Sequence, residues 1–176
     1  MPSNYLAVDV PEEIRTELCL IQGIIQELDP GFKPYQFEKI HMTLLYMGQR
    51  FKEENKEALE QFDKDVKSII KRPYTLVFDK PRVELFPPGK GNLVVIEYNC
   101  NSDGNVLFGN LLGHIDDGTH GRDSWRPHIT LGKLSNIKVD LSGLEKGLND
   151  LITGKFESKG FHLVGTSEKN KLKWEI

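Results

Sequence analysis

The chain has 176 residues and a net charge of −3 at pH 7. That length fits one domain, residues 1–176, which can bury a sizeable apolar core without disulfides or metals. The negative charge argues against the broad basic surface that holds long duplex DNA. No apolar run approaches the ~18 residues of a membrane-spanning helix, and the first residues lack the pattern of a secretory signal. We therefore expect a cytoplasmic protein that binds neither membranes nor long duplex DNA.

Hydrophobic periodicity predicts alternating strands and helices in the first half of the chain. Proline and glycine positions mark where these elements end. In chain order we expect a strand at residues 5–10, a helix at 11–28, a strand at 40–47, a helix at 53–70, and strands at 74–78, 83–86 and 93–98. Pro81 separates two of these strands, and residues 87–91 form a hairpin turn.

The second half continues the same alternation around a polar loop at residues 116–124. We expect a helix at 105–115, a strand at 127–134, a helix near 141–152, and closing strands near 156–164 and 172–176. Strands and helices mixed in this order indicate an α+β domain.

One four-residue motif occurs twice. Residues 41–44 are His-Met-Thr-Leu, and residues 128–131 are His-Ile-Thr-Leu. The chain has only five histidines, so two of them in the same setting indicate a shared role rather than chance. Each copy falls on a predicted strand.

The repeated motif suits the chemistry of a phosphodiester. Side chains two positions apart point to the same face of a strand, so each motif presents its histidine together with its threonine. If the two strands lie close together, His41 and His128 can act as acid and base, because imidazole titrates near neutral pH. Thr43 and Thr130 can donate hydrogen bonds to phosphate oxygens as negative charge develops there. We expect these four residues to be catalytic.

The motif also leaves two alternatives to this chemistry. The first is a purely structural role, since histidine and threonine both occur in ordinary strands and a single copy would carry little weight. The second is a catalytic metal, but each motif offers one good ligand and contains no carboxylate or thiolate. We expect neither a metal nor another cofactor.

Four residues beside the motifs are candidates for substrate binding. Trp125 and Tyr46 can stack on a base, with packing in the core as the alternative. Arg126 and Lys133 flank the second motif and can attract a phosphate. Arg122 is a weaker candidate, because a charged loop residue is usually only solvated.

At these positions the sequence resembles the 2H phosphoesterase superfamily, and most of the chain is similar to its LigT-like branch of RNA 2′,3′-cyclic phosphodiesterases, also called 2′-5′ RNA ligases. The superfamily is named after two His-x-Thr or His-x-Ser motifs on neighbouring strands. The similarity also covers residues 5–11, 39–44, 86–87 and 125–133. One position departs from the pattern: Lys133 stands where many relatives have an arginine, and lysine cannot make the planar two-bond contact with phosphate.

The resemblance implies an α+β, bilobal fold with approximate twofold symmetry, in which two antiparallel-sheet lobes face each other across a central groove. Each lobe would bring one motif to the groove. The resemblance also implies substrates among RNA ends, short oligonucleotides and cyclic nucleotides.

We predict a monomeric phosphodiesterase that hydrolyses 2′,3′-cyclic phosphate ends without a metal. His128 is expected to take a proton from water, and His41 to give one to the leaving ribose oxygen. Within enzymes, the alternative is a 2′,5′-oligoadenylate phosphodiesterase. An alternative of another class is a module that binds a nucleotide such as AMP without turnover.

Overall fold

The computed structural model describes residues 4–48, 50–51, 55–115 and 125–176. Its strands form one sheet in the order β7-β4-β5-β6-β3-β1-β8-β9, with β2 paired to β6 beside this path. All the pairings are antiparallel. The strands are β1 (Tyr5–Val8), β2 (Lys33–Pro34), β3 (Met42–Tyr46), β4 (Leu76–Phe86), β5 (Leu93–Cys100), β6 (His128–Lys133), β7 (Lys155–Ser158), β8 (Gly160–Val164) and β9 (Lys173–Glu175).

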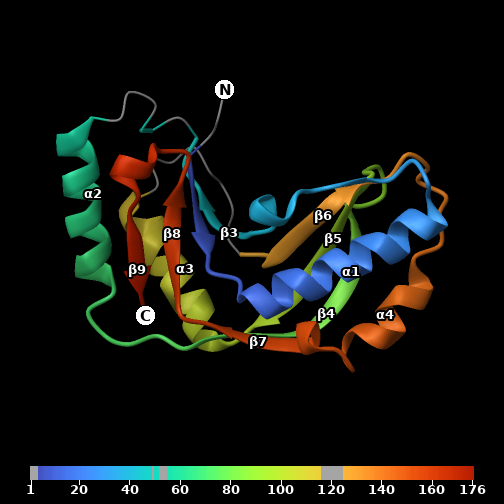
Figure 1. The fold of residues 1–176 in the computed structure, drawn as a ribbon. Helices are drawn as coiled ribbons and strands as arrows, with labels where there is room; N and C mark the ends of the chain where they lie inside the picture. The colour runs from blue at the N-terminus through green and yellow to red at the C-terminus, as the bar shows by residue number, and fades with distance from the viewer. Residues whose placement is uncertain (1–3, 49, 52–54, 116–124) are drawn as a thin grey trace.

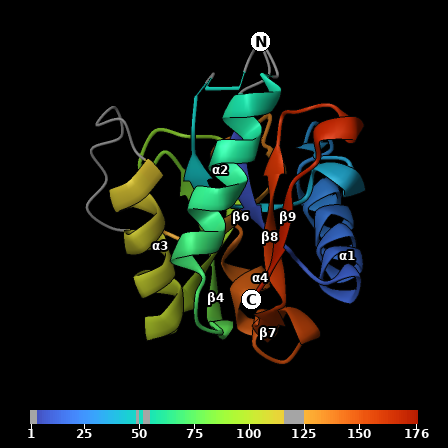
Figure 2. The same ribbon diagram turned by 90° about the vertical axis from the view of Figure 1, so that its left-hand side faces the viewer.

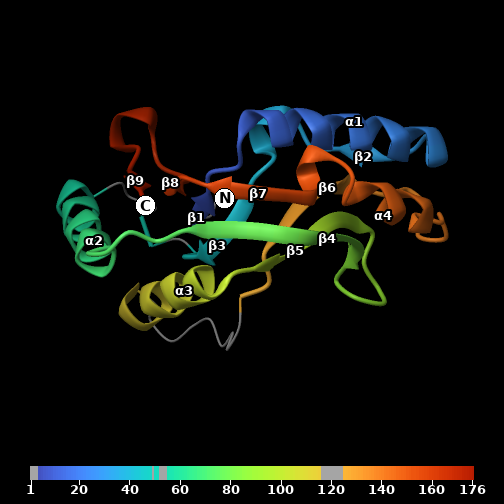
Figure 3. The same ribbon diagram turned by 90° about the horizontal axis from the view of Figure 1, so that it is seen from below.

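The helices are α1 (Glu12–Leu28), α2 (Lys56–Ile69), α3 (Ser102–Ile115) and α4 (Ser142–Leu148), with short 3-10 turns η1 (Phe37–Lys39), η2 (Ile152–Gly154) and η3 (Glu168–Asn170). Helices α1 and α4 lie in the half of the molecule that holds β4, β5 and β6, and α2 lies in the half that holds β8 and β9 (Figure 1). Helices α1 and α3 lie on opposite sides of the strands (Figures 2 and 3). In the described part of the chain, no helix is both long and apolar enough to cross a membrane.

The sheet is joined at its middle by a single residue pair. Strands β3 and β6 pair only at Met42 and Ile129, so the sheet divides into a half with β7, β4, β5 and β6 and a half with β3, β1, β8 and β9. Both residues of the pair are fully buried, and apolar side chains from both halves form one core cluster. The predicted α+β architecture with two antiparallel lobes is confirmed.

The prediction that Pro81 separates two strands is wrong. Strand β4 runs through it from Leu76 to Phe86. The pairing with β5 shifts register between Asp79 and Arg82, and Lys80 there has a positive φ of 50°. Pro81 therefore lies in a bulge, where the ladder does not need the backbone N–H that proline lacks.

Helix α1 fixes the strand that carries the second motif. The buried Gln22 donates hydrogen bonds to the carbonyl oxygens of Tyr35 (2.9 Å) and Leu131 (2.7 Å). At the helix end, the Asp29 carboxylate accepts hydrogen bonds from the backbone N–H and the hydroxyl of Ser135, just after β6. Buried side-chain contacts of this kind stabilise one arrangement of helix and strand, because leaving such groups unpaired is costly.

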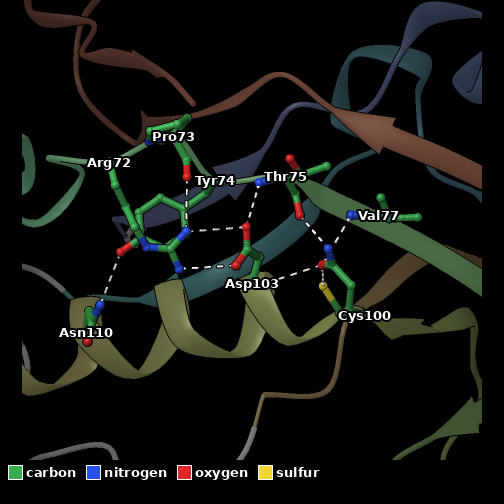
Figure 4. Close-up of polar contacts among 10 residues, drawn as sticks. Arg72, Pro73, Tyr74, Thr75, Val77, Cys100, Asp103 and Asn110 are labelled. Atoms are coloured by element: carbon green, nitrogen blue, oxygen red, sulfur yellow. Dashed lines mark hydrogen bonds and ion pairs between the residues drawn. The ribbon is translucent and has the colours of Figure 1, made fainter.

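A polar cluster fixes the start of α3 to the chain that leads into β4 (Figure 4). The Arg72 guanidinium lies 3.1 Å from the Asp103 carboxylate, which also accepts from the backbone N–H of Thr75. Asn101, directly before α3, donates to the Thr75 carbonyl and accepts from the N–H groups of Gly104 and Val77. Asn101 therefore caps the helix and joins it to β4.

We expect Asn101→Ala to lower the free energy of unfolding by about 1–2 kcal/mol, because the variant loses a helix cap and leaves nearby groups unpaired. Urea denaturation followed by circular dichroism measures this change. Asn105→Ala is the matched control, because Asn105 is exposed on the same helix. Equal stability of the two variants would contradict the role given to Asn101.

Candidate active site

The two motifs lie on adjacent strands in the middle of the sheet. Since Met42 pairs with Ile129, continuing the antiparallel register by one residue places His41 opposite Thr130 and Thr43 opposite His128. Directly opposed side chains on one face have Cβ atoms roughly 5 Å apart. The two histidines and two threonines therefore form a square on the face opposite to the buried Met42 and Ile129, and all four are half-buried.

Both imidazoles are held by the same backbone contact. Nδ1 of His41 lies 2.7 Å from the carbonyl oxygen of Lys39, and Nδ1 of His128 lies 2.9 Å from that of Arg126. A carbonyl can only accept, so each Nδ1 carries a hydrogen and donates it. The Nε2 atom of each ring is then the one available for proton transfer.

An aromatic ring supports each imidazole. Tyr5 stacks on His41 with ring centroids 4.7 Å apart, and Phe86 stacks on His128 at 5.6 Å. These rings limit rotation of the imidazoles, so each ring is fixed by one hydrogen bond and one stacked neighbour. The two halves of the site match in backbone contact and in aromatic support.

Polar side chains continue across the sheet on both sides of the motifs. Successive register pairs align one row of residues from β4 to β9: Arg82, Glu97, His128, Thr43, Ala7, His162 and Lys173. The pairing of His128 with Thr43 in this row follows from the β3–β6 register. Ala7 has the smallest side chain of the row, so the side chains rise least above the sheet between Thr43 and His162.

His162 is a third histidine of the site that sequence reasoning missed. Its Nδ1 lies 2.6 Å from Oδ1 of Asp9, whose other oxygen is 3.3 Å from Nζ of Lys173. The pKa of Asp9 lies below the ordinary value. Burial raises this pKa, but the hydrogen bond and positive charge of His162 and the charge of Lys173 together outweigh that effect. Asp9 thus orients an imidazole, although not one of the motif imidazoles. No local motif marks His162, because its place depends on β8 pairing with the distant β1.

The pKa of His41 lies below the ordinary histidine value. Burial is the main cause, because it disfavours the charged ring. The carbonyl of Lys39 acts in the opposite direction, while the charges of His162 and His128 lower the pKa further. His41 is therefore neutral near pH 7 in the free protein.

Two unlike cavities adjoin the histidines. The larger, about 620 Å³, lies beside His41, and its lining includes Tyr5, Asp9, Arg15, His162 and Lys173. The smaller, about 250 Å³, lies beside His128 and has a largely apolar and aromatic lining: Thr43, Leu44, Leu45, Tyr46, Phe86, Phe108, Leu112, Trp125 and Arg126. A molecule with its phosphate between the two imidazoles would have a different environment on each side.

The predicted substrate-binding residues differ in their placement. Tyr46 is 45% exposed at the smaller cavity, which argues against a core role. Trp125 lines the same cavity, but its indole N–H donates to the Thr43 carbonyl at 3.0 Å and its ring stacks on Phe108. It thereby supports the first motif, and stacking on a base stays a prediction. Arg126 also lines this cavity and lies 2.5 Å from Glu97.

Lys133 is the last residue of β6, three positions after Thr130. The pairing of β6 with β5 shifts register after Thr130, which pairs with Val95, so Lys133 pairs with Leu93 and returns to the face of Thr130. Its side chain is exposed and lines neither cavity. Phosphate binding by Lys133 stays a prediction. Arg122 lies outside the described residues.

No protein-family model matches the sequence. Two curated relatives are both named RNA 2′,3′-cyclic phosphodiesterase. The Archaeoglobus fulgidus protein is 24% identical over 163 residues, and the Methanocaldococcus jannaschii protein is 27% identical over 167 residues. Each match covers 90% of this chain and 88% of the relative.

Solved structures share the fold over nearly the whole chain. TT0787 of Thermus thermophilus has a TM-score of 0.69 at 19% identity, covering 99% of this chain and 95% of the other. Escherichia coli LigT in complex with 3′-AMP has a TM-score of 0.64 at 16% identity, covering 100% and 96%. The fold is therefore that of the LigT-like 2H phosphoesterases. Together with the curated relatives, it confirms the predicted resemblance to that family.

We expect the His41 imidazole to titrate below pH 6.5 in the free protein, because burial and two neighbouring histidines disfavour its charged form. NMR spectra of the ring nitrogens recorded against pH measure this pKa. In His128→Gln the pKa of His41 should rise, since one positive neighbour is lost. A His41 pKa at or above 6.5 in the wild type, or no rise in the variant, would contradict the description of the site.

Proposed function

We propose that the protein is a metal-independent phosphodiesterase that hydrolyses the 2′,3′-cyclic phosphate ends of RNA or nucleotides. The observation that carries this proposal is the paired His-Thr square on β3 and β6, with both Nε2 atoms available for proton transfer. The names of the two curated relatives support the same reaction. Within the described residues, no group of three or more His, Cys, Asp or Glu side chains could hold a metal ion.

In the proposed reaction, Nε2 of His128 takes a proton from water as the water oxygen bonds to phosphorus. The bond from phosphorus to one ribose oxygen breaks, and that oxygen receives a proton from Nε2 of His41. Thr43 and Thr130 hydroxyls donate to the two non-bridging oxygens, where negative charge increases in the transition state. After one turnover, His128 has gained a proton and His41 has lost one, and exchange with solvent restores both.

The lowered pKa of His41 is compatible with its role as the acid. A bound phosphate adds negative charge next to the ring and so favours its protonated form. Because burial disfavours the positive charge, the protonated ring is a stronger acid than an exposed imidazolium. It can then pass its proton readily to the leaving ribose oxygen.

A 2′,5′-oligoadenylate phosphodiesterase is the second candidate function. The presence of one cavity on each side of the histidine pair favours it, because a 2′,5′ linkage joins two nucleosides through one phosphate. In either case we propose that the single domain works as a cytoplasmic monomer on short nucleotide substrates.

The first experiment measures hydrolysis of the four nucleoside 2′,3′-cyclic monophosphates and 2′,5′-triadenylate in excess EDTA. We expect His41→Ala and His128→Ala each to lose about 10²–10⁴-fold in kcat/KM, because each removes one proton-transfer group. The better substrate decides between the two enzyme functions. Full activity in either variant would contradict the assigned chemistry. Tight AMP binding without any turnover in the wild type would instead indicate a nucleotide-binding module.

We expect Thr43→Val and Thr130→Val each to lower kcat on the order of 10²-fold, because each removes a donor aimed at a developing charge. Thr16→Val is the control, since Thr16 is exposed on α1 and its hydroxyl donates to the Glu12 carbonyl of its own helix. Steady-state kinetics on the preferred substrate provide the comparison. Motif variants that behave like the control would remove the threonines from the mechanism.

A further inference from the structure

The larger cavity has features that water attack on a cyclic phosphate does not require. We propose that it binds a second phosphate of the substrate, the 5′-phosphate of the same nucleotide whose cyclic phosphate lies between His41 and His128. This inference rests on the proposed function and specifies the substrate: a nucleotide phosphorylated at its 5′ position, as at the end of an RNA strand, rather than a nucleoside cyclic phosphate alone.

Arg15 is the first residue that points to an anion. It lies on α1 at the cavity, and its guanidinium stacks 4.6 Å from the ring centroid of Phe37. Its Nε atom is buried and has no hydrogen-bond partner among the described residues. A buried N–H without an acceptor is unfavourable, and a phosphate oxygen is an acceptor that guanidinium groups bind well.

His162 and Lys173 also line the cavity. His162 donates from Nδ1 to Asp9, which leaves Nε2 as the ring atom free to meet a ligand. Asp9 shares its charge between His162 and Lys173. The other carboxylate on the lining is Glu38, an exposed residue of η1. The lining also includes Lys171, so cationic side chains outnumber carboxylates.

The smaller cavity has a different lining, and this difference supports the proposed position of the 5′-phosphate. In a nucleotide the base and the 5′-carbon leave opposite ends of the ribose, and the cyclic phosphate lies between them on the other face. A nucleotide placed across the two histidines therefore sends its base to one side and its 5′-phosphate to the other. The aromatic lining beside His128 suits a base, and the Arg15 side suits the phosphate.

Titration calorimetry on the full chain tests this subsite with two ligands that differ only in the 5′-phosphate, adenosine 2′-monophosphate and adenosine 2′,5′-bisphosphate. In the wild type we expect the bisphosphate to bind about tenfold more tightly. In Arg15→Gln and in Lys173→Gln this preference should fall to about twofold or less. Lys173 is exposed on β9, so its variant is expected to fold even if a change in α1 perturbs stability.

Lys56→Gln is the matched control, because it removes one positive charge from an exposed site on α2 and should keep the full preference. Equal affinity of the two ligands in the wild type would overturn the proposed subsite, as would a preference that survives in both cavity variants. Hydrolysis of adenosine 2′,3′-cyclic phosphate by the same samples reports on the proposed function separately. If the cyclic phosphate is hydrolysed but the bisphosphate shows no advantage, only the subsite is wrong.

Discussion

The antiparallel register of β3 on β6 is the constraint on which the site depends. A single pair, Met42 with Ile129, joins the two halves of the sheet. A slip of one residue would turn the histidine and threonine of one strand toward the core and expose its apolar residues. Because both residues of the pair are fully buried, the core opposes such a slip. The same burial that holds the halves together thus sets the positions of the four motif side chains.

Each half fixes its own motif strand by buried polar contacts. On the β6 side, Gln22 of α1 and Asp29, directly after the helix, bind the strand and the residues that follow it. On the β3 side, the buried Asn4 exchanges backbone hydrogen bonds with Met47 and Gly48, and its side chain binds Phe51 and Gly165. The two halves resemble each other most at the imidazoles, where the backbone contact and the stacked aromatic ring match. The cavities beside the two imidazoles differ, so the two ends of a bound substrate would meet different surroundings.

The sequence pattern predicted those parts of the fold and site that depend on the alternation of side chains along a strand. The strand period places each histidine with its threonine, and the repeat brings the two pairs into one site. Positions set by distant pairing could not be predicted: His162 reaches the groove because β8 pairs with β1. Helix α4 is shorter than expected, ending at Leu148 before a separate turn at Ile152–Gly154. Its two glycines weaken the helical preference that apolar spacing alone suggests.

The most direct test of the central claim, that both imidazoles act on one phosphate, is a ligand titration followed by NMR of the histidine ring nitrogens. Adenosine 2′-monophosphate is added at constant pH to the wild-type protein. We expect the Nε2 signals of His41 and His128 both to shift, with the same midpoint concentration, because one phosphate lies between them. A shift of only one histidine, or two clearly different midpoints, would show that the two motifs do not form a single site.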